Sequence, residues 1–285
     1  MKNGILEIDH LLTKVEQPEL AGVHFERLGF TVTPLSPIES MGLCNRLVLF
    51  APLTSGSANF IELMGVSDSQ RLPPSMAQLM QGPPGIRSMV MVTPEAHAAR
   101  AELVQSGYPF GEVHHVSREW VMPDERIQVE FDVLLPVPAP FAFNVCRYFS
   151  LQHYTRPDWT LHANGIRNLE AVYCIAHQPK QAVRYYEDLF GAPAIGSDAQ
   201  GWSVSPGQVA LTVFSPESWL HAFDTPASPG FAGYRLCSAN IEATLHYLQS
   251  TGLQISLNKN RELMLPSDSM FGCHVHVVEL PQSAI

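Results

Sequence analysis

The sequence has little of what disulfide-stabilised or nucleic-acid-binding proteins require. Its five cysteines are scattered and odd in number: Cys44, Cys146, Cys174, Cys237 and Cys273. Because they lack the paired spacing of a metal site, we expect reduced thiols in a cytoplasmic protein. The chain has 17 Lys and Arg against 27 Asp and Glu, which gives a net charge of −10 without any basic cluster. Nucleic acid is therefore not an expected partner.

Long apolar runs are absent as well. No segment has the roughly 20 apolar residues that a membrane helix needs, so no membrane partner is expected. Glu7 and Asp9 stand where a secretory signal would need an apolar core. The sequence also lacks a G-x-S-x-G elbow, an H-E-x-x-H pair, a phosphate loop and a dinucleotide fingerprint. These absences exclude several enzyme classes without choosing one.

What the sequence does contain is a unit that recurs four times. Each copy is an apolar strand, an amphipathic helix, a glycine that ends the helix, and further strands. The expected helix starts are Pro18, Pro94, Pro179 and a position near Asn240, and the ends are Gly29, Gly107, Gly191 and Gly252. Proline suits the first helical turn because its missing N–H would have no intrahelical partner there. Glycine suits the left-handed position after the last turn.

The units read β-α-β-β-β and predict an α+β fold. The segments after each glycine are short, apolar and bounded by Pro, Gly, Ser and Asn, which is typical of strands and hairpins. A length of 285 residues favours two domains. The main compositional break is the proline-rich stretch at residues 134–140. We therefore expect an N-terminal domain at residues 1–135, a connecting segment at 136–165 and a C-terminal domain at 166–285.

The pattern resembles the vicinal oxygen chelate superfamily, which includes glyoxalase I, bleomycin resistance proteins and extradiol dioxygenases. The resemblance rests on "IDHLLTKV" in the first strand, "HFERLGFTVTP" at the first helix end and "NFIELMG" in the last strand of the first unit. Residues 156–172 are similar to the glyoxalase-like branch, where a His-Pro-Asn-Gly element leads into the third unit; here Ala163 replaces the proline. The resemblance implies four modules paired into two open, barrel-like mixed sheets with helices outside.

The resemblance also implies a metal site. In this superfamily the first and last strands of the units supply inward side chains that bind a divalent metal. Carried over by position, the metal ligands would be His10, Glu62 and Glu130, with His276 as the alternative. Imidazole and carboxylate ligands suit Zn, Ni, Mn, Co or Fe(II). The sequence is equally compatible with a protein that holds no metal.

The residues themselves support part of this set. Strand alternation places Phe60, Glu62 and Met64 on one face. A carboxylate among apolar neighbours needs a cation or a strong donor nearby, unless the strand is an edge strand that points it to water. His10 is either a ligand or a hydrogen-bonded core histidine. Glu130 shares a face with two other polar residues, which is also the pattern of a solvated sheet face.

Three functions follow as expectations. The first is a metal-dependent glyoxalase-like lyase or isomerase that acts on a small oxygenated metabolite, with Glu62 and Glu130 as catalytic carboxylates. The alternative is a metal-free small-molecule binding or resistance-type protein. An extradiol-type dioxygenase ranks third, because the C-terminal half lacks its two His and one carboxylate. The expected pocket residues are Phe60, Met64, Trp120 and His153. The expected partner is a small-molecule ligand, and a homodimer is compatible with this reading.

Overall fold

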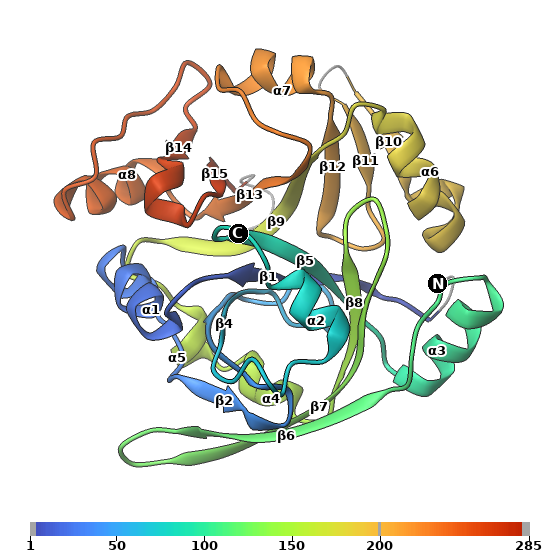
Figure 1. The fold of residues 1–285 in the computed structure, drawn as a ribbon. Coiled ribbons are helices and arrows are strands. Elements are labelled where there is room, and N and C mark those ends of the chain that lie inside the picture. The colour runs from blue at the N-terminus through green and yellow to red at the C-terminus, as the bar shows by residue number, and fades with distance from the viewer. Residues whose placement is uncertain (1–3, 199–200, 281–285) are drawn as a thin grey trace.

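The computed structural model describes residues 4–198 and 201–280, which form two mixed sheets with helices outside them (Figure 1). The first sheet has eight strands in the order β2-β3-β4-β1-β5-β8-β7-β6. The second has seven strands in the order β10-β11-β12-β9-β13-β15-β14. The expected α+β class and the pairing of modules into two sheets are therefore confirmed.

The first sheet contains the first two modules. Its strands are β1 (Glu7–Lys14), β2 (Ser36–Ile38), β3 (Leu43–Leu49), β4 (Phe60–Val66), β5 (Gly85–Val92), β6 (His114–Val121), β7 (Arg126–Val137) and β8 (Phe143–Tyr148). Its helices are α1 (Pro18–Arg27), α2 (Pro74–Leu79) and α3 (Ala96–Gln105), and a 3-10 turn spans Glu39–Met41. β1 and β5 pair antiparallel, and each also pairs in parallel with the last strand of its own module. The sheet curls until Ser36 on β2 donates a hydrogen bond to the carbonyl of Glu119 on β6, at 3.1 Å. It is therefore an almost closed barrel.

The second sheet contains the last two modules. Its strands are β9 (Ile166–Ile175), β10 (Ile195–Ser197), β11 (Trp202–Val204), β12 (Ala210–Phe214), β13 (Gly230–Ser238), β14 (Leu263–Leu265) and β15 (His274–Glu279). Its helices are α6 (Pro179–Phe190), α7 (Pro216–Phe223) and α8 (Ile241–Ser250). β9 and β13 pair antiparallel at its centre. Residues 253–258, in the segment after Gly252 where a further strand of the fourth unit was expected, join no ladder. Asn258 instead accepts bonds from the backbone N–H groups of Asn260 and Glu262 and closes a turn.

The helix ends follow the proline and glycine signals with one exception. α1 and α6 begin at prolines, and Asn240 caps α8 by accepting a bond from the N–H of Ala243 at 2.9 Å. α3 begins at Ala96 instead of Pro94, because the side chain of Glu95 caps it. Gly107 has a φ of 90°, a left-handed conformation that favours glycine.

The first sheet extends past the expected domain boundary at residue 135. β7 continues to Val137, and β8 lies within the segment 136–165 and pairs with both β5 and β7. Two short helices follow, α4 (Leu151–Tyr154) and α5 (Pro157–Thr160). The segment 136–165 therefore supplies a strand of the first barrel before the chain crosses to β9.

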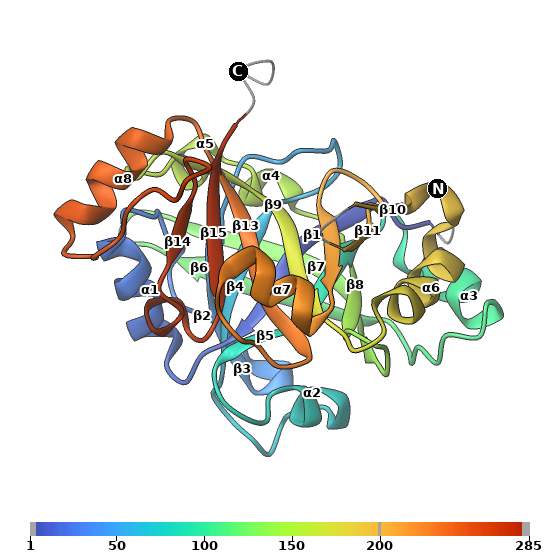
Figure 2. The same cartoon turned by 90° about the horizontal axis from the view of Figure 1, so that it is seen from above.

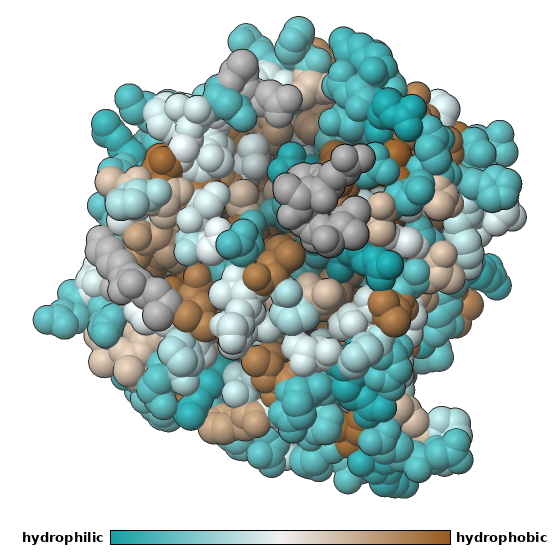
Figure 3. Space-filling view, turned by 180° about the vertical axis from the view of Figure 1, so that it is seen from behind, coloured by the Kyte–Doolittle hydropathy of each residue, from teal (hydrophilic) through white to brown (hydrophobic). Residues whose placement is uncertain are grey.

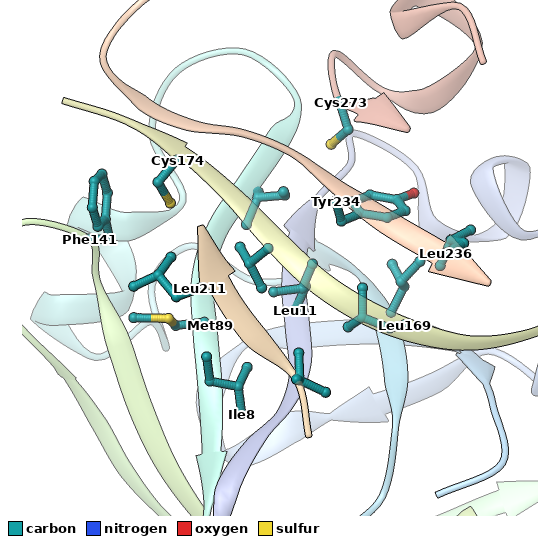
Figure 4. Packing of buried hydrophobic residues seen from close by; sticks show 14 of the residues in the cluster. Ile8, Leu11, Met89, Phe141, Leu169, Cys174, Leu211, Tyr234, Leu236 and Cys273 are labelled. Carbon is teal, nitrogen blue, oxygen red and sulfur yellow. The ribbon is translucent and has the colours of Figure 1, made fainter. Parts of the chain in front are cut away.

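The two sheets pack back to back (Figure 1), so that the second lies over the first when seen from above (Figure 2), and the largest hydrophobic core has residues from both. Ile8, Leu11 and Met89 of the first sheet share this core with Leu169, Leu211 and Tyr234 of the second (Figure 4). Buried Asn59 ties the sheets together: its Nδ2 donates to the carbonyl of Leu169 at 3.0 Å, and its Oδ1 accepts from the N–H of Leu169 at 2.8 Å. The concave faces of the two sheets therefore point away from each other.

The face seen from behind is mixed in polarity. Teal hydrophilic groups lie there among white and brown residues, and scattered apolar residues on a surface are normal for a folded protein (Figure 3). Among residues 4–198 and 201–280, no helix is both long enough and apolar enough to cross a membrane.

The segment between the sheets is fastened by a neutral histidine. His162 Nδ1 accepts a hydrogen bond from the N–H of Thr31 at 3.0 Å, and its ring packs edge-on against Phe30 and Phe50. Burial lowers the pKa of His162 from its ordinary value of 6.5 to about 4. The unfolded chain therefore binds a proton at this residue at a higher pH than the folded protein does.

Acid is accordingly expected to weaken the protein through His162. The stability that this neutral ring contributes is fully present above pH 6.5, and it is lost as the pH falls toward 4, by about 3 kcal/mol at most. Urea unfolding of the wild type and of His162→Gln between pH 7 and 4.5 measures this, and the variant should show a shallower pH dependence. His97→Gln, at an exposed position, is the control and should follow the wild type. Equal slopes for all three proteins would contradict the assignment.

Candidate functional site

The concave face of the first sheet encloses a pocket. Its cavity, of about 60 Å³, is lined by residues from all eight strands of this sheet and by one residue each from α2, α4 and the 3-10 turn. This space accommodates several water molecules or the end group of a small ligand. The polar lining residues are His10, Glu62, Arg118 and Asn144, and the apolar and aromatic ones include Leu12, Ile38, Met41, Leu43, Phe60, Met64, Met76, Val90, Phe131, Val133, Leu135, Cys146, Tyr148 and Tyr154. An apolar wall with a few convergent polar groups is typical of small-molecule sites.

His10 is held in one orientation by its neighbours. The β1–β5 ladder shifts register between Ile8 and His10, and such a bulge lets adjacent side chains meet that a regular strand would point apart. His10 Nδ1 is hydrogen-bonded to the carboxylate of fully buried Asp9, and the hydroxyl of Tyr148 lies 3.3 Å from the same nitrogen. The imidazole also stacks on the ring of Phe60, with centroids 3.9 Å apart. Since Asp9 can only accept the Nδ1 proton, Nε2 is the nitrogen left to exchange protons.

Glu62 and Arg118 are linked through one amide. Glu62 Oε2 lies 3.8 Å from His10 Nε2, and its Oε1 accepts a hydrogen bond from Asn45 Nδ2. The carbonyl oxygen of the same Asn45 accepts from Arg118 Nη1 at 2.5 Å. Three strands, β3, β4 and β6, thus bring an amide, a carboxylate and a guanidinium together at the pocket. This network supplies the strong donor that Glu62 was expected to need.

Burial keeps two tyrosines and a cysteine of the pocket in their neutral forms. It raises the pKa of Tyr154 to about 12, although the nearby Arg118 opposes the rise. Burial also raises the pKa of Tyr148 and of the Cys146 thiol well above their ordinary values, and the negative charge of Asp9 adds to both shifts. These groups therefore stay protonated at neutral pH. Proton acceptance in the pocket falls to His10 and Glu62.

Four of the residues expected from the sequence lie at the pocket and two lie beside it. His10 and Glu62 are brought together, and Phe60 and Met64 line the cavity as expected. Trp120 is fully buried behind the lining, where it packs on Tyr154 with ring centroids 5.1 Å apart. His153, on α4, does not line the cavity, and its Nε2 lies 3.3 Å from the amide nitrogen of Gln152.

Glu130 lies on the opposite face of its strand from the pocket. Phe131, Val133 and Leu135 of β7 point into the cavity, so the alternation of the strand turns Glu130 away. Its Oε1 accepts a hydrogen bond from Ser117 Oγ at 3.3 Å. The sequence interpretation took this strand as the last of its module, whereas the last strand is β8.

His276 belongs to the other sheet and cannot join His10. The hydroxyl of Tyr173 lies 2.9 Å from His276 Nδ1, and Glu262 Oε2 lies 3.3 Å from its Nε2. Burial lowers the pKa of His276, although Glu262 opposes this. The modules therefore pair in chain order, the first with the second and the third with the fourth. His276, the alternative metal ligand, lies on a strand of the second sheet, outside the pocket.

The donor set at the pocket does not fit the metal centre of the superfamily. The first module offers His10 and Glu62, but the second presents Val90, Asn144 and Cys146 to the cavity. In the described part of the chain, no three His, Cys, Asp or Glu side chains are grouped in a way that could hold a metal ion. Catalytic metal sites usually have about three protein ligands. His10 and Glu62 supply only two, and the protonated Cys146 thiol does not supply a third.

The concave face of the second sheet is occupied by α7. A capping box formed by Ser215 and Ser218 starts this helix. Trp219, fully buried, and Phe223 pack from it against Tyr173 of β9. The face that corresponds to the pocket of the first sheet is therefore filled by aromatic side chains of the chain itself.

Comparison with known families now decides the identity of the fold. Residues 8–190 match the model of the glyoxalase-like domain. The chain belongs to this family. Its two back-to-back module pairs are the fold of the vicinal oxygen chelate superfamily, as the resemblance implied. No curated protein matches the chain significantly.

Solved structures resemble this glyoxalase-like protein in fold. A hypothetical protein from Staphylococcus aureus has a TM-score of 0.64 at 10% identity, with 95% of this chain and 98% of that chain covered. A mutant of 4-hydroxymandelate synthase from Streptomyces coelicolor has a TM-score of 0.58 at 11% identity, with 97% and 93% covered. A xylose isomerase-like TIM barrel/4-hydroxyphenylpyruvate dioxygenase fusion protein has a TM-score of 0.55 at 12% identity, and this chain spans 50% of it. At such identities the likeness concerns the fold alone.

Proposed function

We propose that this glyoxalase-like protein binds a small oxygenated molecule in the pocket of the first sheet and catalyses proton transfer on it, as a lyase or isomerase. The observation that carries the proposal is the Asp9–His10 pair. Asp9 accepts the Nδ1 proton, which leaves Nε2 at the cavity beside Glu62. A histidine oriented in this way by a buried carboxylate is a typical general acid–base.

The proposed step needs no co-reactant. His10 Nε2 takes a proton from the carbon next to a carbonyl of the ligand, and the electron pair of that C–H bond moves to the carbonyl oxygen as an enolate. Asp9 stabilises the imidazolium that forms, because its carboxylate already bonds Nδ1. Protonation of the enolate on the opposite face of that carbon, with His10 releasing its proton to solvent, completes an isomerisation. Departure of a neighbouring group with its bonding electron pair instead gives a lyase reaction.

A metal-free binding protein is the second candidate. Met41, Met64 and Met76 form much of the apolar wall, and methionine side chains adapt to ligands of different shape. This candidate predicts binding without turnover. The metal-dependent forms, lyase or dioxygenase, are less well supported, since each needs more His and carboxylate donors than His10 and Glu62 supply.

A screen of small carbonyl compounds in D2O tests the proposal. NMR follows the exchange of each compound's proton next to the carbonyl, and thermal unfolding follows binding. We expect at least one compound that both raises the unfolding temperature and exchanges its proton faster with protein than without. Stabilisation without exchange would favour the binding protein. Bound metal together with a stability gain on adding divalent ions would instead favour the metal-dependent enzyme, and a lack of any binding would contradict both metal-free candidates.

A further inference from the structure

We propose that the ligand of this pocket is an organic acid whose carboxylate binds Arg118 and whose apolar part packs on the methionine-rich wall. The inference rests on the proposed function and names the chemical class of its ligand. It starts from a charge in the pocket that the protein itself does not neutralise.

Arg118 lines the cavity and is only 7% exposed. Its Nη1 donates to Asn45, but its Nε has no hydrogen-bond partner. None of the ion pairs within 4.0 Å among residues 4–198 and 201–280 includes its guanidinium. The other arginine that is buried to this degree, Arg46, pairs with Glu26, and the less buried Arg235 pairs with Glu170 at 2.7 Å.

A buried cation without an anion costs free energy, and arginine cannot relieve it by losing its proton. The ring of Phe131, 5.6 Å from the guanidinium carbon, offsets part of this cost by a cation–π contact. Neither the ring nor an amide oxygen replaces a carboxylate. Because the guanidinium lies at the cavity, an anion can reach it from the ligand side.

Asn45 keeps Glu62 from serving as that anion. Its NH₂ group donates to Glu62, and its oxygen accepts from Arg118, so the amide stands between the two charges with each end matched to one of them. Glu62 therefore remains directed toward His10 Nε2. Arg118 is left as the cationic corner of the pocket, and its planar fork suits a carboxylate.

The other lining residues indicate the chemical character of the rest of the ligand. Beside Arg118 the wall is formed by Leu12, Ile38, Met41, Met64 and Met76. These side chains offer no hydrogen-bond donor to a second polar group. A carboxylic acid whose short remainder is apolar or aromatic, apart from the reactive carbonyl that faces His10, therefore matches the lining.

Matched acid and amide probes test the inference. Phenylacetate and phenylacetamide, and acetate and acetamide, are titrated at equal ionic strength into protein labelled with ¹⁵N-arginine. The Nε–H signal of Arg118 is assigned by its loss in Arg118→Lys. We expect phenylacetate to shift this signal and to bind at least about tenfold more tightly than phenylacetamide, since a charge-assisted hydrogen bond contributes that much.

The variants separate this inference from pocket binding in general. Arg118→Gln should remove the preference for the acid, whereas Arg126→Gln, exposed on the same hairpin, should keep it. An amide that binds as tightly as its acid, or a preference that survives in Arg118→Gln, would overturn the inference and leave the proposed function standing. Acids that neither bind nor shift the Arg118 signal would overturn it too. The wild-type signal and Arg118→Lys decide the question even if Arg118→Gln does not fold.

Discussion

Replacing Trp219 by alanine is expected to destabilise the protein by about 3–5 kcal/mol. The indole is fully buried and lies at ring-centroid distances of 4.3 Å from Phe223, 5.3 Å from Phe214 and 6.0 Å from Tyr173. Removing it leaves a cavity under α7 that the rigid sheet cannot close. Urea unfolding followed by circular dichroism measures the free energy.

The neighbouring position supplies the control. Leu220 on the same helix is 48% exposed, so Leu220→Ala should change stability by no more than about 0.5 kcal/mol. A Trp219→Ala variant within 1 kcal/mol of this control would show that α7 does not fill the face. Because the pocket lies on the far side of the other sheet, phenylacetate binding should be unchanged in Trp219→Ala while it is folded. The filled face therefore restricts the candidate site to the first barrel.

Replacing His10 by glutamine is expected to lower the rate of ligand proton exchange by about 10²–10⁴-fold, the usual contribution of a general acid–base. Glutamine keeps a polar group at this position but cannot carry the proton of a C–H bond. Binding should change little, since Arg118 and the apolar wall remain. The measurement is NMR-detected exchange in D2O with the compounds that the screen identifies.

Two further variants sharpen this result. His153→Gln is the matched control, because His153 lies outside the cavity lining, and it should exchange at the wild-type rate. Asp9 is a positioning residue, so Asp9→Asn should change the pH profile of the exchange rate as well as its maximum. A His10→Gln variant that keeps a rate within threefold of wild type would remove His10 from the mechanism and leave the binding protein as the better candidate.

The local architecture of this protein can be predicted from its sequence. Prolines at helix starts, glycines after helix ends and runs of apolar residues are local signals, and they give the modules of both sheets. Alternation within "FIELM" likewise places Phe60, Glu62 and Met64 on one inward face. These features depend on neighbours in the chain, so no knowledge of the tertiary contacts is needed.

Two further residues of the site, Arg118 and Asp9, have recognisable patterns in the sequence. Arg118 shares the inward face of β6 with Val116 and Trp120. An arginine at the middle position of such an apolar face indicates a charge directed inward. Asp9 stands next to His10, but only the bulge in β1 lets the two meet. The bulge comes from pairing with β5, which the sequence of β1 does not specify.

The misplaced ligand Glu130 has a definite cause. The proline-rich stretch at residues 134–140, which overlaps the end of β7, predicted the end of the first domain and so made β7 its last strand. The segment that follows, β8, instead inserts between β5 and β7. Pro136 lies within β7, and only Pro138 and Pro140 fall in the connection to β8. These prolines mark a turn between two strands of one sheet, because a chain can leave a sheet through a turn and return beside another strand.

The sequence by itself determined the helices and the inward face of Glu62, because these follow from local backbone preferences and from the alternation of apolar residues. The inward position of His10 was implied only by the family resemblance. Only the tertiary structure decided which modules pair. The antiparallel contact of β1 with β5 brings Arg118 and Asn144 of the second module to the pocket that His10 lines, and it leaves His276 in the other sheet. Strand pairing depends on contacts between distant segments that all present similar apolar faces, and a local pattern does not distinguish among such partners.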